Sequence, residues 1–186
     1  VRSPPSGETA PMIVTDPVAE VEALSIKPHP RIPLPQAIYG EGRINSHGMN
    51  LYDEPALVRL AADMQTAMQK SWDASPVVGG KVLSGKEKPS LNPADNRHTV
   101  GLIHEADADS IKQAVDVAVA AQPAWNATPA ETRGEILLRA ANLFEQRSAE
   151  LMALCVREAG KSIPDSISEV REAVDFLRYY ARRAVI

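Results

Sequence analysis

Side chains that could take part in chemistry gather on the last predicted helix of the chain, which begins at Ser162. They follow one another at helical spacing, on the side opposite an apolar stripe. Such a face can line a small-molecule site, and it can equally be a solvated face held by ion pairs, for which we expect Arg171 with Asp175 and Asp175 with Arg178. The residues of this face are Glu169, Glu172, Asp175, Phe176, Arg178, Tyr179 and Tyr180.

The sequence contains one thiol, that of Cys155. It lies on the apolar side of a predicted helix, one turn from Leu151, and no histidine within a turn could lower its pKa. We therefore predict a buried structural thiol and no catalytic residue in this chain. A single cysteine also excludes an intrachain disulfide, and it fits a reducing compartment.

Motifs for phosphates, dinucleotides and metals are incomplete. Gly160-Lys161-Ser162 looks like the end of a phosphate-binding loop, but that loop needs a glycine where Cys155 stands and a strand where a helix is predicted. The glycines at 79, 80 and 85 do not form a dinucleotide fingerprint. The histidines at 29, 47, 98 and 104 share no ligand spacing. We predict no cofactor-binding and no metal-binding residue.

The composition excludes some partners. The 186 residues include 20 basic and 24 acidic side chains, a net charge of −4, which gives no footprint for nucleic acid. No apolar run approaches the roughly 20 residues that span a bilayer, and we expect no secretory signal. The length suffices for one domain with its own core.

Proline divides the chain into two parts. Eight of the 15 prolines fall within the first 35 residues, so residues 1–52 are predicted to form a Pro-rich extended connector. The stretch from Pro28 to Pro35 is typical of a polyproline spacer, with a ligand for a proline-recognising module as the alternative. Residues 53–186 carry the folded elements.

The second part is mostly helical, with short strands between its first two helices. We expect a helix from the cap Asp53, with a stripe that reaches as far as Trp72. Strands are predicted at 77–83 and 98–104, with another around 89–91 and a hairpin across 92–96.

Four further helices are marked by their ends. The first runs from the cap Asp107 to about Gln122, where Pro123 ends it. A capping box, Thr128-Pro129-Ala130-Glu131, begins the second, and Ser148 begins the third, which stops at Gly160. Ser162 begins the last, whose stripe is Ile163, Ile167, Val170, Val174, Leu177, Ala181 and Val185.

Several of these segments resemble a known family. Four of them resemble segments in the N-terminal part of an aldehyde dehydrogenase. They are Asn92-Pro93-Ala94-Asp95, Pro123-Ala124-Trp125, the stretch 157–161 and Phe176-Leu177-Arg178-Tyr179-Tyr180-Ala181. The stretches 38–51, 156–161 and 169–176 further resemble the bacterial bifunctional proline utilization A family. The fold class implied is α/β. Residues 53–186 would be an incomplete aldehyde dehydrogenase-like NAD-binding domain, mostly helical here with a short β-hairpin, after the Pro-rich linker 1–52.

The resemblance also implies a function for the parent protein. An FAD-dependent proline dehydrogenase would make pyrroline-5-carboxylate, and an NAD-dependent dehydrogenase would oxidise the derived glutamate semialdehyde to glutamate. NAD and FAD belong to the parent, with neither expected on this segment alone. The parent would be cytoplasmic, or peripheral to the membrane through its flavin domain.

For the segment itself, the resemblance implies a structural role. The family's catalytic residues lie downstream, and Glu169 alone matches a position near the aldehyde substrate. We expect the segment to be inactive alone and to expose apolar faces that the remainder of the polypeptide, another chain or a second copy covers. The alternatives are a free-standing helical interaction module and an aldehyde dehydrogenase of other substrate specificity.

Overall fold

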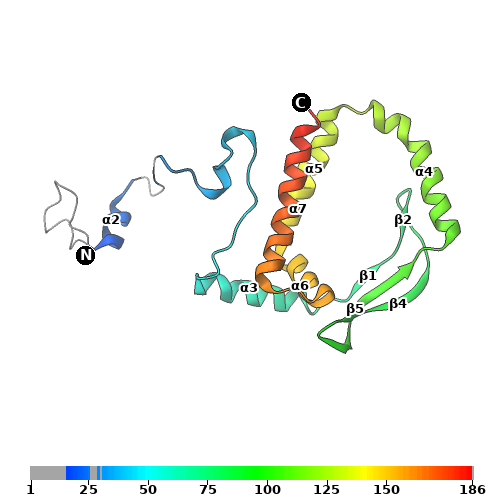
Figure 1. Cartoon of the computed structure of the whole chain (residues 1–186), viewed down its shortest axis with the longest axis horizontal. Coiled ribbons are helices and arrows are strands. Elements are labelled where there is room, and N and C mark those ends of the chain that lie inside the picture. The colour runs from blue at the N-terminus through cyan, green and yellow to red at the C-terminus, as the bar shows by residue number, and fades with distance from the viewer. Residues whose placement is uncertain (1–15, 26–28, 30, 186) are drawn as a thin grey trace.

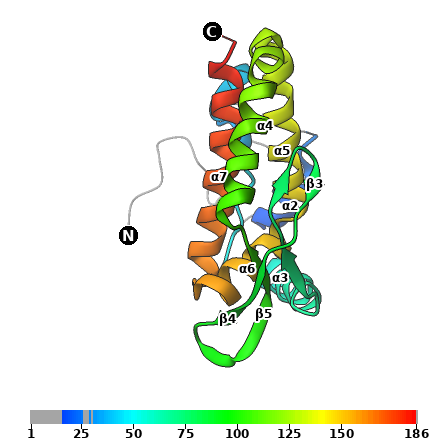
Figure 2. The ribbon, with the colours of Figure 1, turned by 90° about the vertical axis from the view of Figure 1, so that its right-hand side faces the viewer.

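The structure, a computed structural model, describes residues 16–25, 29 and 31–185, and Figure 1 shows a helical layer beside a small sheet. Helices α5 (Ala130–Gln146) and α7 (Ile163–Arg183) lie side by side. Helices α3 (Glu54–Ala67) and α6 (Ser148–Ala159) pack together at one end of this pair (Figures 1 and 2). Helix α4 (Ala108–Ala127) stands apart from the pair (Figure 1). The predicted α/β class, mostly helical with a short hairpin, is confirmed.

The predicted helix ends are largely confirmed by their capping bonds. The side chains of Asp53, Asp107 and Ser162 accept hydrogen bonds from backbone N–H groups of the first turns of α3, α4 and α7. Gly160 ends α6 in the left-handed conformation, with φ of 65°. The junction of residues 160–162 is therefore a helix stop followed at once by a helix start.

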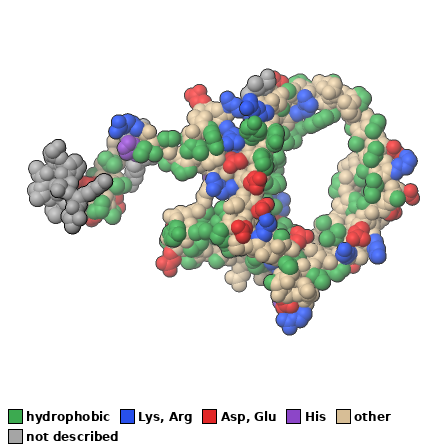
Figure 3. Space-filling view, in the orientation of Figure 1, with side chains coloured by type: hydrophobic (Ala, Val, Ile, Leu, Met, Phe, Trp, Pro, Cys, Tyr) green, Lys and Arg blue, Asp and Glu red, His purple; other side chains and the backbone are tan. Residues whose placement is uncertain are grey.

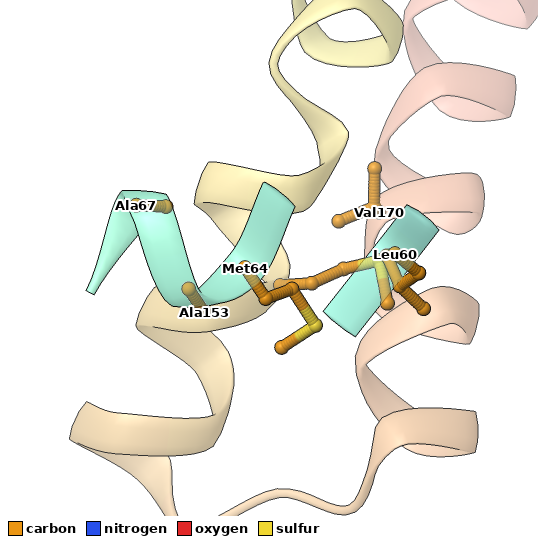
Figure 4. Packing of buried hydrophobic residues seen from close by; sticks show 6 residues of the cluster. Leu60, Met64, Ala67, Ala153 and Val170 are labelled. Carbon is orange, nitrogen blue, oxygen red and sulfur yellow. The ribbon is translucent and has the colours of Figure 1, made fainter. Parts of the chain in front are cut away.

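The main core joins three helices. Leu60, Met64 and Ala67 of α3 pack against Met152 and Ala153 of α6 and Val170 of α7, and Figure 4 shows these side chains meeting where the helices cross. Apolar groups removed from water here supply the main force that holds the helices together, about 25 cal/mol per Å² buried. This core holds the first half of α7 against α3 and α6.

The sheet has the order β1–β5–β4. Strands β4 (Lys86–Asn92) and β5 (Asp95–Glu105) are antiparallel and joined through Pro93-Ala94, which confirms the hairpin. Strand β1 (Trp72–Ala74) pairs in parallel with β5. The expectation that Trp72 continues the stripe of the preceding helix is wrong, because α3 ends at Ala67 and Trp72 enters this strand.

The single strand predicted for 77–83 is also wrong. Gly79 and Gly80 both have positive φ, 57° and 78°, so the chain turns there. The strands β2 (Val77–Val78) and β3 (Lys81–Val82) pair as an antiparallel hairpin whose turn is Gly79-Gly80. A Gly-Gly pair is favoured in such tight turns, because both central residues need left-handed backbone.

Pro123 does not end its helix, and the capping box does not form. Helix α4 continues through Pro123 to Ala127, because α4 has no buried residue and water can satisfy the carbonyl that the proline leaves free. Thr128, which precedes Pro129, is extended and ends the helix instead. Its hydroxyl donates to the carbonyl of Ala124, so it does not cap α5.

The described part of the connector is extended between short helical turns. These turns are α2 (Pro17–Ala23), η1 (Pro35–Ala37) and η2 (Gly40–Gly42). Helix α2, capped by Asp16, departs from the expected extended chain, although it buries no residue. Most of the predicted polyproline stretch, including Pro28 and Pro30, lies outside the described residues. In the described part of the chain, no helix is both long and apolar enough to cross a bilayer.

Replacing Gly160 by alanine should lower the free energy of unfolding by more than the backbone strain alone. The left-handed conformation costs a non-glycine residue about 1–2 kcal/mol. A Cβ at 160 would also lie 3.2 Å from Cγ of Pro93 in the hairpin turn. Gly40→Ala is the control, because Gly40 has φ of 59° and open space around it. Urea denaturation of both variants measures the difference, and equal losses would show that the hairpin contact contributes nothing.

Candidate functional site

The outer face of α7 is the candidate substrate-facing surface. Glu169 lies there, half-exposed, and forms an ion pair with Lys161, which follows the Gly160 stop. This hydrogen bond raises the pKa of Lys161, so the ammonium group stays charged beside the carboxylate. The pair links the start of α7 to the end of α6 at the surface.

Aromatic rings continue this face toward the C-terminal end of α7. Phe176 and Tyr180 lie with their ring centres 6.0 Å apart, and Tyr179 meets Tyr180 edge to face at 5.2 Å. Phe176 and Tyr180 are each about half exposed. Together with α5 they form a shallow groove lined by Leu137, Phe144, Ala173, Phe176, Leu177 and Tyr180. All of these side chains present apolar surface, which favours contact with another molecule or segment.

Arg178 does not belong to this outer face, contrary to the sequence prediction. It is 7% exposed, because it stands four residues after Val174 and three before Ala181, both on the buried stripe. Its guanidinium donates to both carboxylate oxygens of Glu145, at 3.0 and 2.7 Å. It also donates to the side chain of Asn142 and to the carbonyl of Asn45.

Asp175 likewise turns away from the expected partners. Its carboxylate accepts hydrogen bonds from the N–H and the hydroxyl of Ser46, at 2.9 and 2.8 Å. The same hydroxyl accepts from Nε of Arg171 at 3.2 Å. The predicted pairs of Asp175 with Arg171 and with Arg178 are therefore wrong, because Ser46 of the connector takes the carboxylate.

We call Ser46, Glu145, Asp175 and Arg178 the connector clamp. Glu145 completes it, because it accepts from the N–H of His47 at 2.9 Å as well as from Arg178. Burial by itself would raise the pKa of Glu145, but the hydrogen bonds from Arg178 and His47 outweigh it and hold the pKa below its usual 4.5. Asn45 and Ser46 are buried by this arrangement.

Sequence reasoning missed the connector clamp. The spacing of Arg178 from Val174 and Ala181 could have indicated a buried arginine that needs an acidic partner. Nothing in the sequence pairs it with Glu145, and nothing brings Ser46 to Asp175, because these partners are 33 and 129 residues apart.

Cys155 has no activated environment. Its thiol is partly buried, and burial first, then the nearby carboxylate of Glu169, raises its pKa. A thiolate nucleophile is disfavoured there. The prediction of a structural thiol agrees with this geometry.

The described residues also do not fit a dinucleotide or a metal. The Gly160 stop presents no glycine-rich loop after a strand, so it offers no pyrophosphate cradle for NAD. No group of three metal-ligating side chains occurs in the described ranges. Two of the histidines instead contact single aspartates, His98 with Asp95 and His104 with Asp73.

Comparisons with known proteins agree with the fold and the motifs. The aldehyde dehydrogenase family matches residues 82–185. The bifunctional protein PutA of Salmonella typhimurium is 45% identical over 175 residues, which are 91% of this chain and 13% of that protein. The expected similarity to a proline utilization A segment is confirmed by this match. The chain spans little more than an eighth of that relative.

Solved structures give the same result. A mutant of the 1-pyrroline-5-carboxylate dehydrogenase of Thermus thermophilus superposes with a TM-score of 0.70 at 29% identity, over 74% of this chain and 27% of that chain. Proline utilization A from Bdellovibrio bacteriovorus, inactivated by N-propargylglycine, superposes with a TM-score of 0.71 at 26% identity. That match covers 75% of this chain and 15% of the other.

Arg178→Met should lower the free energy of unfolding by roughly 2–3 kcal/mol, because it leaves Glu145 without its cation. This loss of unfolding free energy is smaller than the loss expected when a fully buried ion pair is broken, because the side chain of Glu145 keeps some contact with solvent. Arg183→Met on the exposed side of α7 is the matched control, with an expected change under about 0.5 kcal/mol. Equal effects in denaturant melts would contradict the connector clamp.

Stability should also fall at acid pH through Glu145. Its pKa in the folded chain lies below 4.5, so its contribution is complete above pH 4.5 and is lost as the pH falls through the folded value. Glu145→Gln should flatten the curve of unfolding free energy against pH in this acid range. A variant curve parallel to the wild-type curve would show that Glu145 is not the group responsible.

Cys155 should react slowly with a disulfide reagent at about pH 8, because its raised pKa leaves little thiolate. Denaturant should accelerate the reaction to the rate of a free cysteine. Absorbance of the released chromophore follows both rates, and identical rates in the folded and denatured chain would contradict the partly buried site.

Proposed function

The chain belongs to the aldehyde dehydrogenase family, and we propose that it is a structural segment of a bifunctional enzyme that oxidises proline to glutamate. In this proposal residues 53–186 begin the dehydrogenase module, and the connector ties that module to a proline dehydrogenase part. The similarity to PutA supports this assignment, since it covers 91% of the chain and includes most of the connector.

The observation that carries the proposal is the isolation of α4. This 20-residue helix has no buried residue, although Ile111, Val115 and Val119 are apolar and exposed. Figure 3 shows an opening between α4 and the pair α5–α7, with apolar side chains along its borders. Helices of α/β proteins cover the faces of a sheet, so this opening suits a sheet supplied by the remainder of the polypeptide.

The parent activity follows from this assignment. Proline would lose two electrons to FAD and give pyrroline-5-carboxylate, which hydrolyses to glutamate semialdehyde. NAD would supply the hydride acceptor for oxidation of the aldehyde to glutamate. We assign neither cofactor to the described residues, because they offer no cradle for a dinucleotide. Such an enzyme would be cytoplasmic, or it would bind the membrane surface through its flavin domain.

Glu169 would form part of the substrate site. Glutamate semialdehyde carries an ammonium group, and the exposed carboxylate of Glu169 is a suitable partner for it. Lys161 holds this carboxylate at the start of α7, so it would act as a positioning residue. The apolar groove beside Phe176 would then pack against the remainder of the module.

The 186-residue chain alone should give no reduction of NAD with glutamate semialdehyde. The proposed role supplies neither a nucleophile nor a nucleotide loop, and the outcome is read as NADH absorbance. Turnover above a blank without protein would contradict the structural role.

The natural polypeptide provides the complementary test. Captured through an antibody against the connector, it should oxidise proline with an artificial electron acceptor and reduce NAD with glutamate semialdehyde. Oxidation of a different aldehyde alone would favour an aldehyde dehydrogenase of other specificity. A captured chain with neither activity would favour a free-standing interaction module and overturn the proposal.

A further inference from the structure

A second hollow of the molecule lies on the connector side of α7. It is a cavity of about 210 Å³ between the connector residues 46–49, the start of α6 and the first half of α7. Glu169 does not line it, so it is separate from the candidate substrate-facing surface. Its volume is below the 300–1,000 Å³ of pockets for drug-sized ligands, and equals that of about seven waters.

Most of the cavity wall is apolar. Met49 of the connector and Met152 of α6 line it, and α7 contributes Ile167, Val170 and Val174. Met152, Val170 and Val174 are buried in the fold. Walls of this kind hold water weakly, and they favour a ligand with methylene groups.

One end of the cavity carries a guanidinium group. Arg171 lines it and donates from Nε to the hydroxyl of Ser46, the one hydrogen bond recorded for this side chain in the described part of the chain. Within the described residues, the two terminal nitrogens of Arg171 donate no hydrogen bond. A guanidinium binds a carboxylate through two parallel hydrogen bonds, which gives both strength and orientation.

The acidic groups near the cavity are already engaged. Glu145 also lines it, but its carboxylate accepts from Arg178 and from the N–H of His47. Asp175 accepts both hydrogen bonds of Ser46. Of the two charged side chains that line the cavity, Glu145 is therefore paired with Arg178, whereas Arg171 makes one hydrogen bond, to Ser46, within the described part of the chain.

We propose that this cavity binds a short aliphatic carboxylate. The carboxylate pairs with Arg171, and a chain of about four to six carbons lies against Met49 and Met152. Because the connector supplies one wall, the bound ligand joins the connector to α7 beside the connector clamp. The inference rests on the cavity alone and is independent of the proposed enzymatic function.

Methyl NMR of the 186-residue chain with labelled methionines tests the site, with hexanoate as the probe. The methyl signals of Met49 and Met152 should shift saturably, because both line the cavity. Met64 and Met68 serve as internal controls, because they lie in the main core outside the cavity. Equal shifts at all four methionines, or no saturable shift, would overturn the proposal.

Charge variants separate the carboxylate contact from simple apolar binding. Arg171→Gln should weaken hexanoate binding about tenfold or more, whereas Arg171→Lys, which keeps the charge and loses the two parallel hydrogen bonds, should weaken it by a smaller factor. Arg183→Gln is the matched control on the same helix and should bind as the wild type does. Hexanol should bind the wild-type chain at least tenfold more weakly than hexanoate, which keeps the test valid if a variant fails to fold. Equal binding of the alcohol and the acid would exclude the role of Arg171.

Discussion

A buried guanidinium is the constraint on which the arrangement of the connector and helices depends. Arg178 is almost fully removed from water, and an unpaired charge there would be costly. Glu145 neutralises it from α5, while the carbonyl of Asn45 takes a further hydrogen bond. The connector must therefore pass over this point, and α5 must lie beside α7. Breaking the pair would weaken both relationships, while Asp175 would still hold the connector through Ser46.

This constraint gives the two sides of α7 different roles. The inner side carries Arg178 and Asp175, which hold the connector through Ser46 and its neighbours. The outer side leaves Glu169, Phe176 and Tyr180 exposed, with Lys161 fixing the carboxylate near the helix start. Under the proposed function, the connector is thus attached directly to the helix that would present the substrate-facing residues.

Helix α4, beside the sheet, has few contacts with the rest of the fold. Helix α4 contacts β2 and otherwise presents its apolar side to open space. The proline within it is tolerated because α4 buries no residue, so water can satisfy the carbonyl that the proline leaves free. The family match at residues 82–185 includes α4 and the strands β4 and β5.

The sequence by itself determined the helix ends that are capped by their own residues, and it determined the family. Side chains that cap their own helix, such as Asp53, Asp107 and Ser162, act within a few residues, and so does the left-handed Gly160; their effects can be predicted from order along the chain. The tertiary structure alone decided that Arg178 is buried, that Asp175 binds Ser46 and that Trp72 joins a strand. Those outcomes depend on partners from distant segments that compete for the same donors and acceptors. The spacing of residues along a helix does not show which distant partner a side chain will bind, because that depends on how the segments pack.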